Sequence, residues 1–545
     1  MTSLVPRAPY SKEELEKLYP KGLELQLVQV PTLWVKKAAT DVNSNSIGER
    51  SPVSSRFQNA GLTPYWPYCN VARSLASMAA TTEDLSKWDS FQWRRKIEQF
   101  GSHDQARIAV GPEAESDGIC TLGELTDLGR QSTYALGTRL RRLYVDQLGF
   151  MPKIRSDTGD MYLRATPIPR ALESLQQAFW GMYPSNARTA DFTTPTIVSR
   201  TPAEETLFPN EGNCHRFRQL ARMFAQRAAD TWNDSEEMTY LNSVLGKWMP
   251  PGSPRIKVDS RPRLSGIMDT INATFVHGPQ TRLPSEFYDP KVREHCDKIA
   301  TNEWFAGYKE SKEYRKLGIG ALMGDVVDRM VSAAVEGGWR PKIDDSSSSS
   351  SSSSSREGDD EAVKFALSGC HDTTIAAILT SLGGFENGKW PSFTSNIAIE
   401  LFRVTDKKKL QHERQAGDIL EELKDPIKNN STDKTSSPSF FSFLTDRKAS
   451  TTTTKPTPSA IARTPLSALP PLRNHYVRIR YNDVPVRIPG CATSPAKHLD
   501  GDETFCTLEA FKEIVDKFTP ADWREECGRN TEGGMFEEGR EPAGY

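Results

Sequence analysis

Apolar and polar residues alternate near the amino terminus of the chain. Residues 23–30 read Leu-Glu-Leu-Gln-Leu-Val-Gln-Val, a pattern close to the two-residue period of a half-buried β-strand. A polar segment, residues 1–22, precedes this strand, and a spacer, residues 31–47, follows it. The loop Gly48-Glu49-Arg50-Ser51-Pro52 comes next. We predict that the strand is buried and that this loop lies beyond its end.

Later segments repeat the order of strand, polar turn and helix. Residues 161–166 predict a short strand, and residues 170–183 predict the helix that follows it. Residues 363–368 predict another strand, which leads into an apolar helix ended by two glycines. A further helix is predicted over residues 130–144, with Thr126 near its N-cap. This repetition is typical of an α/β fold with a mainly parallel sheet flanked by helices.

Four polar residues are predicted where these strands end and loops or helices begin: Arg50, Arg164, His371 and Asp372. We expect them to converge, because the carboxyl ends of parallel strands meet at one edge of the sheet. The two guanidinium groups would hold the oxygens of a phosphoryl group, and His371 would donate to the same anion. Asp372 would protonate a leaving alcohol. Taken singly, such an arginine is usually part of a surface ion pair, so the prediction depends on the combination.

The remaining patterns divide the chain into a core, a cap and low-complexity segments. The stretch after residue 206 is mostly helical in pattern, which indicates a lobe inserted into the α/β core. Ten consecutive serines and a stretch rich in Lys, Ser, Thr and Pro cannot pack, and we expect both to be disordered. The predicted parts are an N-terminal segment (1–22), the core (23–206 and 356–545), the helical cap (207–335), the serine-rich loop (344–358), and an insertion (404–474) within a hairpin formed by strands at 397–402 and 476–486.

Composition and charge narrow the class of protein. The formal net charge of -2 gives no basic footprint for nucleic acid or an anionic membrane. No apolar run is long enough for a signal-peptide core or a membrane span, so we predict an intracellular, cytoplasmic protein, with the mitochondrion as an alternative compartment. The eight cysteines are scattered, with no C-x-x-C pair, so we expect free thiols rather than a zinc site.

Several motifs occur in an informative order along the chain. They are Gly48-Glu49-Arg50-Ser51-Pro52, Gly123-Glu124-Leu125-Thr126, Arg164-Ala165-Thr166 with Arg170, and His371-Asp372. In this order they resemble motifs of the histidine acid phosphatase family, over about residues 23–527. The segments at 207–210, 390–393 and 488–491 are similar to the lysophosphatidic acid phosphatase branch of that family.

The resemblance implies a phosphoglycerate-mutase-like α/β core with a helical cap. It also implies hydrolysis of small or lysophospholipid-like phosphomonoesters through a phosphohistidine, with no metal or other cofactor. By resemblance, Arg50 and Arg164 bind the phosphate, His371 assists, and Asp372 is the general acid. The sequence gives no indication of oligomeric state.

The sequence departs from the family where the nucleophile is expected. The family motif places Arg-His directly before its glycine, whereas this chain has Ser46 and Ile47, and no histidine precedes His103. Isoleucine has no nucleophilic atom, so covalent turnover should fail. Either the chain is a natural pseudoenzyme, or residues 31–47 stand in place of a short segment ending in Arg-His. We favour the second hypothesis, because the disturbance is confined to one strand-to-loop junction.

Two other functions are alternatives to a phosphatase. One is a catalytically silent protein that binds phosphate esters or acts as a scaffold, with the low-complexity segments as interaction or phosphorylation sites. The other is a mutase of the same superfamily, which would need the same missing histidine.

Overall fold

The computed structural model describes the greater part of the chain. The described residues are 8–32, 49–63, 65–71, 78–80, 88–90, 96–110, 118–278, 281–341, 361–385, 389–405, 464–469, 472, 474–536 and 539–545. The predictions about residues 46–48, about the ten serines and about nearly all of the insertion lie outside the described residues.

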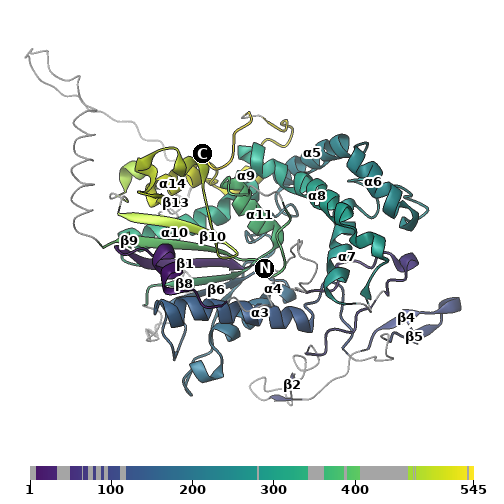
Figure 1. Ribbon diagram of the computed structural model, residues 1–545, viewed down its shortest axis with the longest axis horizontal. Coiled ribbons are helices and arrows are strands. Elements are labelled where there is room, and N and C mark those ends of the chain that lie inside the picture. Colours follow the sequence, from purple (N-terminus) through teal and green to yellow (C-terminus); the bar gives the residue numbers. More distant parts are fainter. Residues whose placement is uncertain are drawn as a thin grey trace, which may run out of the picture.

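A nine-stranded mixed sheet forms the centre of the molecule (Figure 1), in the order β12-β13-β10-β9-β1-β8-β6-β7 with β11 beside β10. The pairs β1–β8, β8–β6 and β6–β7 are parallel, and the pairs from β1 to β9 and onward to β12 are antiparallel. The strands are β1 (Leu23–Thr32), β6 (Met161–Ala165), β7 (Ile197–Val198), β8 (Phe365–Gly369), β9 (Ile397–Val404), β10 (His475–Tyr481), β11 (Val484–Val486), β12 (His498–Leu499) and β13 (Asp502–Thr507). The predicted α/β class is confirmed, and the predicted pairing of the strands on either side of the insertion is the antiparallel β9–β10 ladder.

The alternating pattern of residues 23–30 decides how β1 is buried. Leu27 packs into the hydrophobic cluster on one face of the sheet, while Val28 and Val30 pack into the cluster on the other face. All three are fully buried, as expected for a central strand covered on both faces. The strand runs two residues further than predicted, to Thr32, which pairs with Gly369 of β8.

Helices cover both faces of the sheet. On one face, α3 (Asp127–Leu140) and α4 (Pro169–Met182) lie side by side, and on the other lie α10 (Ala321–Val335) and α14 (Leu508–Asp516) (Figure 1). The contact between α3 and α4 requires glycine, because a Cβ on Gly137 would stand 1.9 Å from the carbonyl oxygen of Ala178. Among the described residues outside the 207–335 segment, the other α-helices are α1 (Lys12–Leu18), α11 (Asp372–Ser381), α13 (Pro489–Ala492) and α15 (Trp523–Cys527).

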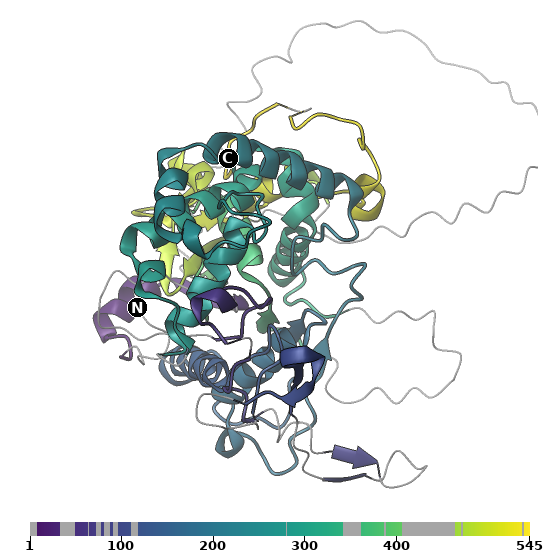
Figure 2. The same cartoon turned by 90° about the vertical axis from the view of Figure 1, so that its right-hand side faces the viewer.

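A group of helices stands beside the sheet and its layers, and Figure 2 shows it from that side. It comprises α5 (His215–Trp232), α6 (Glu236–Leu245), α7 (Leu264–Val276), α8 (Pro290–Glu310) and α9 (Lys312–Arg315). The described residues of the 207–335 segment contain no strand, in keeping with its sequence pattern. Its last helix, α10, packs against β1 of the sheet. The exact boundaries of a cap domain remain a prediction.

Two small hairpins lie away from the sheet. One pairs β2 (Met78–Ala80) with β3 (Trp88–Ser90), and the other pairs β4 (Glu98–Phe100) with β5 (Ala106–Ile108). Both precede α3 in the chain.

Six of the eight cysteines form disulfides, so the prediction of free thiols is wrong for them. The bonds are Cys69–Cys120, Cys214–Cys527 and Cys491–Cys506, while Cys296 and Cys370 are free and buried. The paired cysteines are 51, 313 and 15 residues apart in the sequence. These separations follow no recognisable motif, so the pairing could not be predicted from the sequence. Disulfides are typical of oxidising compartments, which counts against the predicted cytoplasmic location.

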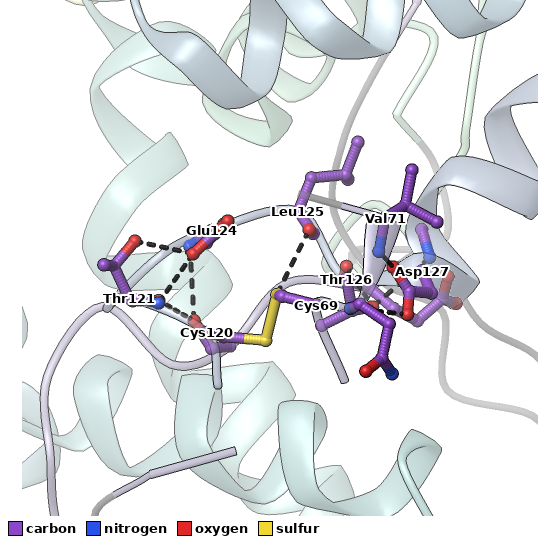
Figure 3. The surroundings of a disulfide bond; sticks show 12 residues. Cys69, Val71, Cys120, Thr121, Glu124, Leu125, Thr126 and Asp127 are labelled. Atoms are coloured by element: carbon purple, nitrogen blue, oxygen red, sulfur yellow. Dashed lines mark hydrogen bonds between the residues drawn. A yellow bond between two sulfur atoms is a disulfide. The ribbon is translucent and has the colours of Figure 1, made fainter. Parts of the chain in front are cut away.

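The Cys69–Cys120 bond fastens the loop that contains Trp66 and Tyr68 to the segment that enters α3 (Figure 3). Beside it, the backbone N–H groups of Asn70 and Val71 donate to the Asp127 carboxylate at 2.8 and 3.0 Å.

Among the described residues, no helix has the length and apolar composition needed to cross a bilayer.

We expect thiol titration of the denatured, unreduced protein to find two reactive thiols, and the reduced protein to give eight. The two thiols are Cys296 and Cys370, which unfolding exposes. Alkylation followed by peptide mass mapping checks which residues react. Eight thiols without reductant would contradict the three disulfides.

Candidate active site

The carboxyl ends of three parallel strands define one edge of the sheet. Gly369 of β8 pairs with Thr32 of β1 on one side and with Ala165 of β6 on the other, so the three strands end level. The chain continues from Gly369 through Cys370 to His371 and Asp372. The predicted convergence at the strand ends therefore has a physical basis in the register of the sheet.

The loop that carries Arg50 is fastened to the segment before α3. Arg50 forms an isolated antiparallel bridge with Leu125, and the backbone N–H of Ser51 donates to the Glu124 carbonyl at 3.0 Å. The N–H of Thr126 donates to the carbonyl of Glu49 at 2.6 Å. Thr126 is also the N-cap of α3, as predicted. Two motifs that are far apart in sequence thus hold each other in place.

The side chain of Arg50 points toward α7 of the helical segment. Its Nη2 donates to Oδ1 of Asp269 at 2.7 Å. Arg56 approaches the same carboxylate, with its Nη1 3.8 Å from Oδ2 of Asp269, and donates to Thr270 at 3.2 Å. One carboxylate therefore serves two guanidinium groups.

Arg170, near the start of α4, belongs to the same cluster of charges. Burial lowers its pKa to about 10, with Arg50 adding to the effect and Asp372 and Asp269 opposing it. Its Nη1 is close to Gly123, since a Cβ built on this glycine would lie 3.5 Å from it. Arg170 is therefore next to the segment that precedes α3. The sequence contained a signal for Arg170, since it stands in the segment that resembles the third arginine of the family.

Arg164, predicted as a phosphate ligand, has other partners. Its side chain is 1% exposed, and its Nη2 donates to Oε1 of Glu205 at 2.7 Å. Its Nη1 lies 3.7 Å from Oδ2 of Asp325. Two carboxylates already neutralise this guanidinium group inside the protein. The geometry therefore favours Arg170 over Arg164 as the partner of Arg50.

His371 lies at the N-cap of α11, beside Thr166. Its Nε2 is 3.1 Å from the Thr166 hydroxyl, and its ring meets the ring of Phe208 edge-on at 5.6 Å. Burial lowers the pKa of His371 to about 3, with Arg170 and Arg50 adding to the effect. The imidazole is therefore neutral at ordinary pH until an anion offsets the two arginines.

Asp372 is the first residue of α11. Its Oδ1 accepts from the Thr373 N–H and its Oδ2 from the indole N–H of Trp390, each at 2.8 Å. Burial raises the pKa of Asp372, although these donors and Arg50 oppose the shift. A carboxyl group that keeps its proton to higher pH is suited to act as a general acid.

Together these residues form a cluster in which arginines outnumber carboxylates. Arg50 and Arg56 contact the carboxylate of Asp269, and the charges of Arg50 and Arg170 act on both Asp372 and the neutral His371. Such a cluster is suited to an oxyanion with several acceptor oxygens. Position 47, where the nucleophile is expected, lies outside the described residues.

Residues 48–416 match the family described as the histidine phosphatase superfamily (branch 2). The chain belongs to this superfamily. The match covers the strands β6, β8 and β9 and the residues of the cluster. The recognition made from the motifs is confirmed.

Two sequence relatives of this chain are named as phosphatases. A probable acid phosphatase of Schizosaccharomyces pombe is 34% identical over 509 residues, which cover 93% of this chain and 95% of the relative. Human lysophosphatidic acid phosphatase type 6 is 24% identical over 290 residues, covering 52% of this chain and 58% of the relative. Among solved structures, the apo form of Hafnia alvei phytase aligns with a TM-score of 0.48 and 13% identity, covering 93% of this chain and 99% of the phytase.

We expect the Arg170→Gln and Arg164→Gln variants to fail in different ways. Loss of Arg170 should weaken binding of inorganic phosphate by about 10- to 100-fold, as for one charged hydrogen bond, with little change in stability. Loss of Arg164 leaves the buried Glu205 carboxylate without its ion-pair partner and should lower the free energy of unfolding by ~3–5 kcal/mol. Calorimetric titration and urea denaturation measure the two effects. The reverse pattern would return Arg164 to the phosphate site.

We expect the His371→Asn variant to lose less stability on acidification than the unmodified chain. The pKa of His371 is about 3 when folded and near 6.5 when unfolded, so only the unfolded state takes up this proton between those values. The contribution of His371 is present above pH 6.5 and is lost as the pH falls toward 3. Urea denaturation across this range provides the measurement, and parallel curves for both proteins would contradict the lowered pKa.

Proposed function

We propose that this protein is a phosphomonoesterase whose phosphate pocket is formed by Arg50, Arg170, His371 and Asp372. The observation that carries the proposal is the position of Asp372 at the start of α11, just after the carboxyl end of β8, where the charges of Arg50 and Arg170 act on it. Two delocalised cations match the geometry of a phosphoryl group, and the carboxyl stands within their field.

Each residue has a role in the proposed reaction. Arg50 exchanges part of its contact with Asp269 for the incoming phosphoryl oxygens, and Arg170 binds the same group. The anion offsets the positive field on His371, so the imidazole gains a proton or donates its existing N–H more strongly. Asp372 gives its proton to the oxygen of the leaving alcohol as the P–O bond breaks.

The reaction needs a nucleophile in addition to this pocket. By the family pattern a histidine nitrogen at position 47 would attack phosphorus, and water activated by the Asp372 carboxylate would then release phosphate. Ile47 supplies no such atom. The intact acid and arginines favour a true phosphatase whose sequence over residues 31–47 is imperfect, and reading the transcript across Val30 to Glu49 decides the matter.

The proposed substrates are small phosphomonoesters, with lysophosphatidic acid as a specific candidate. Support for this candidate comes from the relatives named lysophosphatidic acid phosphatase type 6 and from the aromatic residues near the site. The resemblance implies a reaction without a metal, so chelation by EDTA should leave turnover unchanged.

We expect the unmodified chain to bind inorganic phosphate yet to hydrolyse p-nitrophenyl phosphate only slightly at acidic pH. The double change Ser46→Arg with Ile47→His should raise turnover by several orders of magnitude, toward ~10⁶ for a nucleophile that acts as part of a unit. A matched Ile47→Gln variant controls for the polar change alone. Steady-state kinetics and calorimetry measure turnover and binding.

Three outcomes separate the alternatives. Substantial turnover by the unmodified chain would exclude the silent pseudophosphatase. Phosphate binding without turnover in the double variant, together with a transcript that encodes Ile47, would favour a binding or scaffold role. Absence of phosphate binding in every variant would refute the proposed function.

A further inference from the structure

Asp372 is held from two sides by donors on different segments. One donor is the backbone N–H of its neighbour Thr373, which lies in α11 and contacts Oδ1. The other is the indole Nε1 of Trp390, which contacts Oδ2 at 2.8 Å from the loop that leads into β9. With both oxygens engaged, the carboxyl plane has a defined orientation.

Trp390 is itself fixed by the helical segment. The residue is 9% exposed, and its ring packs against Phe305 with 4.9 Å between the ring centroids. Trp304 meets it edge-on at 6.0 Å. Both neighbours lie on α8, and α8 also packs against α11, which carries Asp372. Aromatic packing around the Trp390 ring therefore fixes the direction of its indole N–H.

We propose that Trp390 is a positioning residue, which orients the Asp372 carboxyl toward the phosphate pocket through its indole N–H. This inference rests on the proposed function, since it assumes that Asp372 faces a bound phosphoryl group. The proposal gives the helical segment a part in the reaction, because α8 packs against the Trp390 ring and Trp390 donates to the Asp372 carboxyl.

The charges around Asp372 fix the sign of the expected effect. Arg50 and Arg170 favour its charged form, Asp269 disfavours it, and burial raises its pKa overall. The neighbouring His371 is neutral. An N–H donor to the carboxylate favours the charged form. Removing the indole donor should therefore raise the pKa of Asp372 further.

The chain offers a matched pair of substitutions for the test. Trp390→Phe keeps an aromatic ring and removes the donor to Asp372. Trp304→Phe makes the same chemical change in the adjacent ring, whose Nε1 is buried and donates to no group among the described residues. Only the first change should alter the acid.

The measurement is the affinity of the unmodified full chain and both variants for inorganic phosphate between pH 4 and pH 8. Affinity should fall as Asp372 ionises, because a carboxylate repels the anion. In Trp390→Phe this fall should occur about one pH unit higher than in the unmodified chain. Trp304→Phe should follow the unmodified chain. An unchanged Trp390→Phe profile, or an equal shift in both variants, would overturn the proposal.

A second measurement keeps the inference separate from the proposed function. If the unmodified chain binds no phosphate, the function fails, and a double-mutant cycle between Trp390→Phe and Asp372→Leu tests the contact directly. The positioning role requires non-additive effects on unfolding in urea, larger at pH 8 than at pH 4, because the N–H binds the charged carboxylate more strongly. Additive effects at both pH values would overturn it.

Discussion

The level ends of β1, β8 and β6 are the constraint on which the candidate site depends. Parallel pairing brings Thr32, Gly369 and Ala165 to one line across the sheet, so the residues that follow them have to share one edge. His371 and Asp372 follow directly from β8. The Thr166 hydroxyl, one residue beyond β6, meets His371. A slip of one residue in this register would turn the side chains of a strand to the opposite faces.

The arginines reach that edge by other means. Arg50 is held by the ladder between its loop and the segment before α3, and the Cys69–Cys120 bond fastens the same region (Figure 3). Arg170 comes from the first turn of α4, and Asp269 of α7 closes the cluster from the helical segment. The cluster thus joins side chains from a loop, from α4 and from α7, and its charges restrain one another. Removing one partner leaves another buried charge uncompensated.

Aromatic packing extends this arrangement away from the charged cluster. Phe208 supports His371, and the rings of Phe305 and Trp390 stand behind Asp372. These contacts leave the acid and the imidazole only partly exposed, and burial is the largest cause of both pKa shifts. The same burial makes each hydrogen bond to these groups stronger than it would be in water.

The sequence by itself determined the fold class, the central strand and the place of His371 and Asp372 after a strand end, and it offered Arg50 as a candidate in a loop. Local period and turn chemistry suffice for this, because strand burial and helix capping depend on near neighbours. Only the tertiary structure shows that Arg164 and Arg170 have different surroundings, since both stand in one short segment and Arg164 contacts Glu205 and Asp325, which are distant in sequence. The disulfides, the Asp269 partner of Arg50 and the Trp390 donor to Asp372 were likewise decided by the folded chain, because they join residues whose separation carries no sequence pattern.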